Sequence, residues 1–215
     1  MKLQAPKIPN KSGLTASTVK QLIAETTIES IWLHDVDASG LIAKSLGIDE
    51  AVLEKVVLAG AKLERFSITD AELRGCDLSA AQCPHASILR THIKGGRLTG
   101  IDLSRSMIRD VVFEGCKLDM ANFRYATLER VSFVDCMLTE TDFQAAELSI
   151  VSFATSTLDR VEFGHCRLKD CDVRTSQLLA VRGWQYLKGL SVDSTQLIAI
   201  APQLALELGI IIKDS

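Results

Sequence analysis

Leucine, isoleucine, valine or phenylalanine stands at every fifth position of this chain from Leu53 to Leu178, with Cys83 as the one exception. A period of five residues fits neither the 3.6-residue period of a helix nor the two-residue alternation of a flat strand. It fits a chain that makes a short strand and then turns a corner in every repeat. The pattern therefore predicts a solenoid of stacked coils.

Each five-residue unit has a fixed pattern around this register residue. The residue two positions earlier is mostly small or β-branched, as at Ala71, Cys76 and Val111. Because side chains alternate along an extended strand, both residues should point inward and the residue between them outward. The last two residues must then turn the chain. The final residue is glycine in units such as those ending at Gly60 and Gly75, where a positive φ is useful.

Phenylalanine adds a longer period of 20 residues, shown by Phe113, Phe133 and Phe153 and, ten residues out of step, by Phe123, Phe143 and Phe163. Four units would therefore close one square coil. The two phenylalanine series should lie on opposite walls, each ring stacked on the next from coil to coil.

Close matches to the motif Ala-(Asp/Asn)-Leu-x-x occur at residues 71–75, 76–80 and 121–125. In this the chain resembles the pentapeptide-repeat proteins, over about residues 51–180. The resemblance implies an all-β fold, a right-handed quadrilateral β-helix (a pentapeptide-repeat solenoid) with an N-terminal helix and a C-terminal helical tail. It also implies a bacterial protein that is not an enzyme, and a branch of the family protects DNA gyrase by imitating DNA.

The N-terminal part departs from the strict repeat. Residues 1–14, which include two prolines and three lysines, predict a flexible tail, and residues 15–30 predict a capping helix. We expect the β-helix to span residues 31–182, with residues 31–50 as a degenerate start. A helix over residues 41–55 is the competing interpretation of part of that start.

The C-terminal part, residues 183–215, predicts a cap followed by a helix. Trp184, Tyr186 and Leu187 should plug the last coil, Asp193 or Ser194 should cap the helix, and Pro202 should kink it or start a second one. The family resemblance suggests a homodimer through this helix, and the alternative is a monomeric cap. The candidate dimer interface is Leu197, Ile198, Ala201, Leu204, Ala205 and Leu208.

The composition argues against several classes of function. The net charge is −3 and the pI about 5.8, so we do not expect direct nucleic-acid binding. Apolar stretches are shorter than a membrane span, so we expect no membrane partner. Five of the six cysteines share one inward position of the repeat, which indicates small buried side chains in a reducing cytoplasm rather than disulfides. Cys83, His85 and His92 should not converge, and we expect no catalytic residue, cofactor or metal.

The remaining candidate is the surface. One outward column should hold Asp102, Asn122, Asp142 and Glu162 as an acidic ladder with one member per coil. We expect a non-enzymatic interaction solenoid whose protein partner the sequence does not reveal. The alternative is a DNA mimic that binds DNA gyrase or topoisomerase IV and protects it from inhibitors such as quinolones. Acidic and basic residues nearly balance over residues 51–180, which favours the first interpretation.

Overall fold

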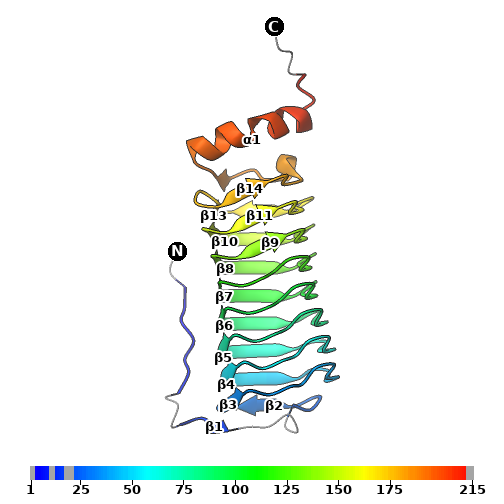
Figure 1. Ribbon diagram of the computed structural model, residues 1–215, viewed down its shortest axis with the longest axis vertical. Coiled ribbons are helices and arrows are strands. Elements are labelled where there is room, and N and C mark those ends of the chain that lie inside the picture. Colours follow the sequence, from blue (N-terminus) through cyan, green and yellow to red (C-terminus); the bar gives the residue numbers. More distant parts are fainter. Residues whose placement is uncertain (1–2, 10–12, 17–21, 212–215) are drawn as a thin grey trace.

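The computed structural model describes residues 3–9, 13–16 and 22–211. Its elements stack into a single column with helix α1 across the C-terminal end (Figure 1). The strands are β1 (Thr15–Ala16), β2 (Thr27–Glu29), β3 (Ile31–His34), β4 (Gly47–Glu54), β5 (Ser67–Arg74), β6 (Ser87–Lys94), β7 (Met107–Glu114), β8 (Thr127–Val134), β9 (Met137–Thr139), β10 (Glu147–Ala154), β11 (Thr157–Asp159), β12 (Arg167–Lys169), β13 (Cys171–Asp172), β14 (Gln177–Leu179) and β15 (Leu190–Ser191). A 3-10 turn, η3 (Trp184–Tyr186), and helix α1 (Ser194–Glu207) complete the fold.

The strands confirm the right-handed quadrilateral β-helix. Successive coils pair in parallel at an offset of 20 residues, as in Leu53↔Leu73 between β4 and β5 and Phe113↔Phe133 between β7 and β8. A long strand such as β4 covers one wall, turns a corner and begins the next. The other two walls pair mostly through single bridges, such as Asp77↔Arg97, and one of them forms the short sheet of β9, β11 and β14 near the C-terminal end. Each coil therefore hydrogen-bonds only to its neighbours.

The core is the inside of this column, and the phenylalanines fill its centre. Phe133 stacks on Phe113 and on Phe153 with ring centroids 4.9 Å apart in both pairs. The second series packs in the same way, and rings of the two series meet edge to face, as Phe123 and Phe133 do at 6.2 Å. Both the stacking and the opposite placement of the two series agree with the prediction.

The last residue of each five-residue unit forms a corner of the coil. It has a positive φ at every fifth position from Glu25 to Asp170. Glycine takes this conformation without strain at Gly60, Gly75 and other corners, but Ile150 adopts it with φ 57°. The same left-handed backbone conformation thus recurs at every corner, although some residues adopt it without strain and others are strained.

The coil starts earlier than predicted, and the N-terminal capping helix over residues 15–30 is wrong. Residues 15–16 form β1, which pairs with β3, and residues 27–29 form β2, which pairs with β4. Residues 17–21 lie outside the described part. Residues 31–50 are β-coil, as the degenerate phase suggested, so the competing helix over residues 41–55 is wrong as well. The reason is that β pairing with the next coil outweighs the local helical pattern.

The C-terminal cap largely agrees with the prediction. Trp184 and Leu187 are buried at the end of the column, and Asp193 caps α1 with a capping box that involves Gln196. The second helix that Pro202 was expected to start is not formed, because α1 runs through Pro202 as one helix. The amide of Gln196 also donates to the carbonyl oxygens of Val173 (2.6 Å) and Ser176 (2.7 Å). Helix α1 thereby satisfies backbone groups that the last coil would leave open.

Candidate partner-binding surfaces

The groups that could do chemistry are dispersed or buried. Cys83 faces the core, His85 lies at a corner, and His92 lies on an outer wall, where its Nε2 is 2.8 Å from Glu114 Oε2. Among the described residues, no three His, Cys, Asp or Glu side chains are grouped to hold a metal ion. Cys83, His85 and His92 therefore lie in different parts of the molecule.

All six cysteines are buried free thiols. Burial raises the pKa of Cys83 to about 12, and it raises the pKa of Cys166 to about 12 as well. Five thiols, including Cys76 and Cys136, donate to backbone carbonyl oxygens of the coil. A neutral, enclosed thiol is a poor nucleophile, so these side chains are packing groups.

The acidic ladder forms as predicted. Asp102, Asn122 and Asp142 are bridged in sequence on one outer wall, and Glu162 and Arg182 continue the column. Each ladder side chain also accepts a hydrogen bond from the backbone N–H two residues further on, as Asp142 Oδ1 does from Gln144 at 2.7 Å. The ladder therefore supports the corners of the coil, in addition to presenting charge.

Basic side chains interrupt the charge of this ladder. Asn122 donates to Asp102 Oδ1 at 2.9 Å, and Arg124 Nη1 lies 3.4 Å from Asp142 Oδ2. Arg160 and Arg182 line the same shallow hollow as Asp142 and Glu162. The wall thus carries charges of both signs rather than a continuous anionic strip.

Helix α1 has two apolar faces. Ile200 is buried against the end of the column and Leu204 is partly covered beside it, so these two residues attach the helix. Ile198 is 77% exposed and Leu206 is 79% exposed on the other side, and Ala201 and Pro202 between them are also exposed. This spacing places an apolar stripe along the outward face.

The predicted dimer interface is only partly on that stripe. Ile198 and Ala201 are outward and exposed, Leu197 and Leu208 are exposed at its margin, and Ala205 is half-buried. The sequence reading missed Ile210 and Ile211, which extend the exposed apolar surface beyond the helix. It also missed Leu206. The helical period itself would have separated Ile200 and Leu204 from the outward residues.

A third surface was not predicted. The corner between β-walls carries a column of alternating charges with one residue per coil: Asp70, Arg90, Asp110 and Arg130. Arg90 donates to Asp70 through Nε at 2.7 Å and Nη2 at 2.5 Å. Arg130 holds Asp110 in the same two-point manner at 2.7 and 2.9 Å. The alternation at 20-residue spacing is the sequence signal that could have revealed this column.

Both carboxylates of this column are buried, with the residues Asp70 and Asp110 exposed by 6% and 3%. The guanidinium of Arg90 lowers the pKa of Asp70, and that of Arg130 lowers the pKa of Asp110, against the opposing effect of burial. Both groups are therefore ionised at neutral pH, and each has lone pairs left for another donor.

Comparison with known proteins identifies the type of repeat in part of the chain. The family model described as "Pentapeptide repeat region" matches residues 106–182. Residues 106–182 carry a pentapeptide repeat. No curated protein matches this chain. None of the helices in the described residues has the length and apolar composition needed to cross a bilayer.

Three solved structures illustrate the range of similar folds. Trypsin-treated QnrB1, a plasmid-mediated fluoroquinolone resistance protein, is 23% identical, with coverage of 89% of this chain and 92% of its own and a TM-score of 0.43. HetL, a pentapeptide repeat protein involved in heterocyst differentiation regulation in the cyanobacterium Nostoc, is 18% identical over 78% and 87%, with a TM-score of 0.40. A pentapeptide repeat protein of the Arabidopsis thaliana thylakoid lumen is 23% identical over 49% and 75%, with a TM-score of 0.43.

Proposed function

We propose that this pentapeptide-repeat protein is a non-enzymatic interaction solenoid that acts through its surfaces. The observation that supports this most directly is the outward stripe of α1, where Ile198 and Leu206 are both more than three-quarters exposed. The walls of the column hold polar and charged ladders, while the thiols are enclosed. Exposed apolar surface that is concentrated in one place is typical of a protein-binding site.

The occupant that suits this stripe best is a second copy of the chain. Ala201 and its neighbour Ala205 are small, so two α1 helices can approach closely, and a two-fold axis places Ile198 of each copy beside the other helix. Such a homodimer would join two columns end to end. It would also cover Leu206, which otherwise stays in water.

Light scattering tests the dimer with a matched pair of variants. Ile198→Glu should give monomers, because a charge would be buried in the interface. Ile42→Glu is the control, because Ile42 is an equally apolar residue that is 73% exposed near the opposite end of the column. A wild-type chain that is monomeric at high concentration, or an Ile198→Glu variant that still dimerises, would exclude this interface.

The wider interaction function is tested by affinity capture with the full chain. A true partner should be retained by the wild type and lost by variants of one surface, either Ile198→Glu or charge reversal on one wall. A protein captured equally by all variants is not a specific partner. If no protein depends on any surface of the column, the interaction function is wrong.

The second candidate function is a DNA mimic that binds DNA gyrase or topoisomerase IV and protects it from quinolones. The observation that favours it is the alignment of Asp102, Asp142 and Glu162 on one wall, with one ladder position per coil. Regularly spaced negative charge is the main feature that DNA-binding surfaces recognise. The arginines in the same hollow weaken this signal, so we place it second.

A gyrase supercoiling assay with and without a quinolone tests this candidate. Inhibition or drug protection by the wild type should be lost in Asp142→Lys with Glu162→Lys. Glu72→Lys with Asp172→Lys, on another wall, is the charge-matched control, and circular dichroism should show that all variants stay folded. No effect of the wild type on gyrase or topoisomerase IV would exclude the DNA mimic and leave the interaction solenoid with another partner.

We also propose that the protein works in a reducing cytoplasm. The six enclosed free thiols are compatible with such a compartment, where cysteine remains reduced. Fractionation of cells that produce the tagged full chain would test this.

A further inference from the structure

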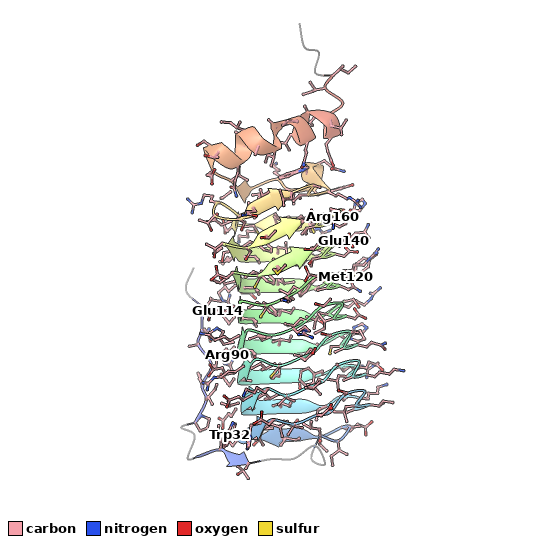
Figure 2. All side chains as sticks on the ribbon, in the orientation of Figure 1. Trp32, Arg90, Glu114, Met120, Glu140 and Arg160 are labelled. Atoms are coloured by element: carbon pink, nitrogen blue, oxygen red, sulfur yellow. The ribbon has the colours of Figure 1, made fainter. Side chains whose placement is uncertain are left out.

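Residues 3–9 run along the outside of the column, in the direction opposite to the order of the coils (Figure 1). The sequence had predicted them as part of a flexible tail, and this prediction is wrong. Figure 2 shows that Arg90 of the charged corner lies on the same side of the molecule. The backbone N–H of Lys7 donates to Asp70 Oδ1 at 2.8 Å, and that of Gln4 donates to Asp110 Oδ1 at 3.2 Å. Segment and corner are therefore joined at two points.

The spacing of the segment matches the spacing of the coils. Asp70 and Asp110 are two coils apart, which is roughly 9.6 Å at the usual distance between strands. Gln4 and Lys7 are three residues apart, which is about 9.3 Å for a polyproline II chain. Because that conformation repeats every three residues, the N–H groups of Gln4 and Lys7 can point the same way. Pro6 favours this conformation.

The segment is held mainly by features that do not depend on its charged side chains. The side chains of Gln4 and Lys7 are exposed although their N–H groups are bound. Leu3, Pro6, Ile8 and Pro9 are half-buried, and three of these four residues are spaced three apart. Each of the two bound N–H donors therefore follows a half-buried leucine or proline.

The carboxylates are suited to this task. Asp70 and Asp110 are fixed by Arg90 and Arg130, so they need not change rotamer to accept a peptide N–H. A hydrogen bond from a neutral N–H to a buried carboxylate is stronger than one between two neutral groups. Two such acceptors at a rigid spacing select an extended chain over a helix, in which most N–H groups are already used.

We infer that this corner, defined by Asp70, Arg90, Asp110 and Arg130, is a docking track for an extended partner peptide with prolines three residues apart. Residues 3–9 occupy the track in cis as a resident ligand, which a partner segment of the same pattern displaces. This inference rests on the proposed interaction function and specifies one surface and the chemistry of its partner. The tether gives the resident segment an effective concentration in the millimolar range, so it guards the track against weak ligands.

The test uses the full chain with the resident segment weakened. Gln4→Pro with Lys7→Pro removes the two N–H donors, because proline has none. Ala5→Pro is the matched control, since it adds a proline to the same segment and keeps both donors. The probe is a fluorescent peptide with the sequence of residues 1–14, followed by anisotropy up to about 1 mM.

The double variant should bind the peptide in a saturable manner, and the wild type and Ala5→Pro should bind it at least about tenfold more weakly, because their tracks are occupied. Adding Asp70→Asn and Asp110→Asn to the double variant should abolish binding. A peptide with Pro6 and Pro9 changed to alanine should bind more weakly, which tests the track without altering the protein.

Three results would overturn the inference. They are no binding to the double variant, equal binding to the wild type, or binding that ignores both the aspartates and the prolines. Dimers that persist in Ile198→Glu but vanish in the double proline variant would show that copies exchange this segment, and would overturn the partner assignment. The three binding results depend on neither α1 nor gyrase, so the track can fail while the proposed function stands.

Discussion

Arg90 reaches across one coil to Asp70 and donates to both of its carboxylate oxygens, at 2.7 and 2.5 Å. The side chain of Asp70 is 9% exposed and that of Arg90 is 20% exposed, so the pair is largely out of water. By contrast, Asp172 and Arg174 form a similar two-point contact at the surface, with 37% and 61% of their side chains exposed. The two pairs share their chemistry and differ in burial.

Asp70→Ala should lower the free energy of unfolding by about 2–3 kcal/mol, because it leaves the Arg90 guanidinium without its partner in a partly buried site. Asp172→Ala should cost less than about 1 kcal/mol, as exposed pairs usually do. Urea unfolding followed by circular dichroism measures both values. Equal costs for the two variants would mean that burial does not strengthen the corner pair.

The corner column should also make the protein sensitive to acid. Because the arginines lower the pKa of Asp70 and Asp110 in the folded state, the unfolded chain takes up these protons first as the pH falls. The stability from both pairs is therefore present above about pH 4, the ordinary range of an aspartate, and is lost as the pH falls through the lowered folded values.

The comparison is between the wild type and Asp70→Asn with Asp110→Asn, which cannot titrate at these positions. Urea midpoints measured from neutral pH down to about pH 2.5 should fall more steeply for the wild type. Parallel curves would show that the two carboxylates have the same pKa in the folded and unfolded chains.

The sequence was sufficient for the column itself because its burial pattern is strictly local. An apolar residue at every fifth position, such as Leu53 or Phe133, leaves a single coil geometry that buries all of them. The N-terminal part could not be read in this way. Leu22 and Ile23 fit one face of a helix, but Leu22 is buried and the following residues 27–29 pair with β4, which depends on a coil formed by residues far along the chain.

The candidate surfaces were predictable to different degrees. The acidic ladder followed from the five-residue phase, so Asp102 and Asp142 were placed correctly. The docked segment was not, because contacts such as Lys7 with Asp70 join residues 63 apart and involve a backbone group that every sequence has. The sequence composition near Pro6 suggested a flexible tail. Only the folded positions of the Asp70 and Asp110 carboxylates show that this segment binds to the corner.

The phenylalanine stack should dominate the stability of the central coils. Phe133 is fully buried between Phe113 and Phe153, and two further rings meet it edge to face. Phe133→Leu should cost about 1–2 kcal/mol more than Phe66→Leu, because Phe66 is buried outside the two stacks. Thermal or urea unfolding measures the difference, and equal costs would assign the stabilisation to buried area alone.

One corner offers a gain in stability. Ile150 has a φ of 57°, in the left-handed region where a β-branched side chain is strained and asparagine is tolerated. Ile150 is half-buried, so its replacement also gives up some apolar contact. Relief of strain of about 1–2 kcal/mol should exceed that loss, and Ile150→Asn should raise the free energy of unfolding by about 0.5–1 kcal/mol.

Ser149→Asn is the matched control for this corner, because Ser149 precedes Ile150 and is not among the residues with a positive φ. This variant introduces asparagine one residue earlier, where the backbone has no strain to relieve. The urea midpoint should rise for Ile150→Asn and stay constant for Ser149→Asn. If both variants are unchanged or weaker, the apolar contacts of Ile150 outweigh its backbone strain, and the repeat uses this side chain to pack the outside of the corner column.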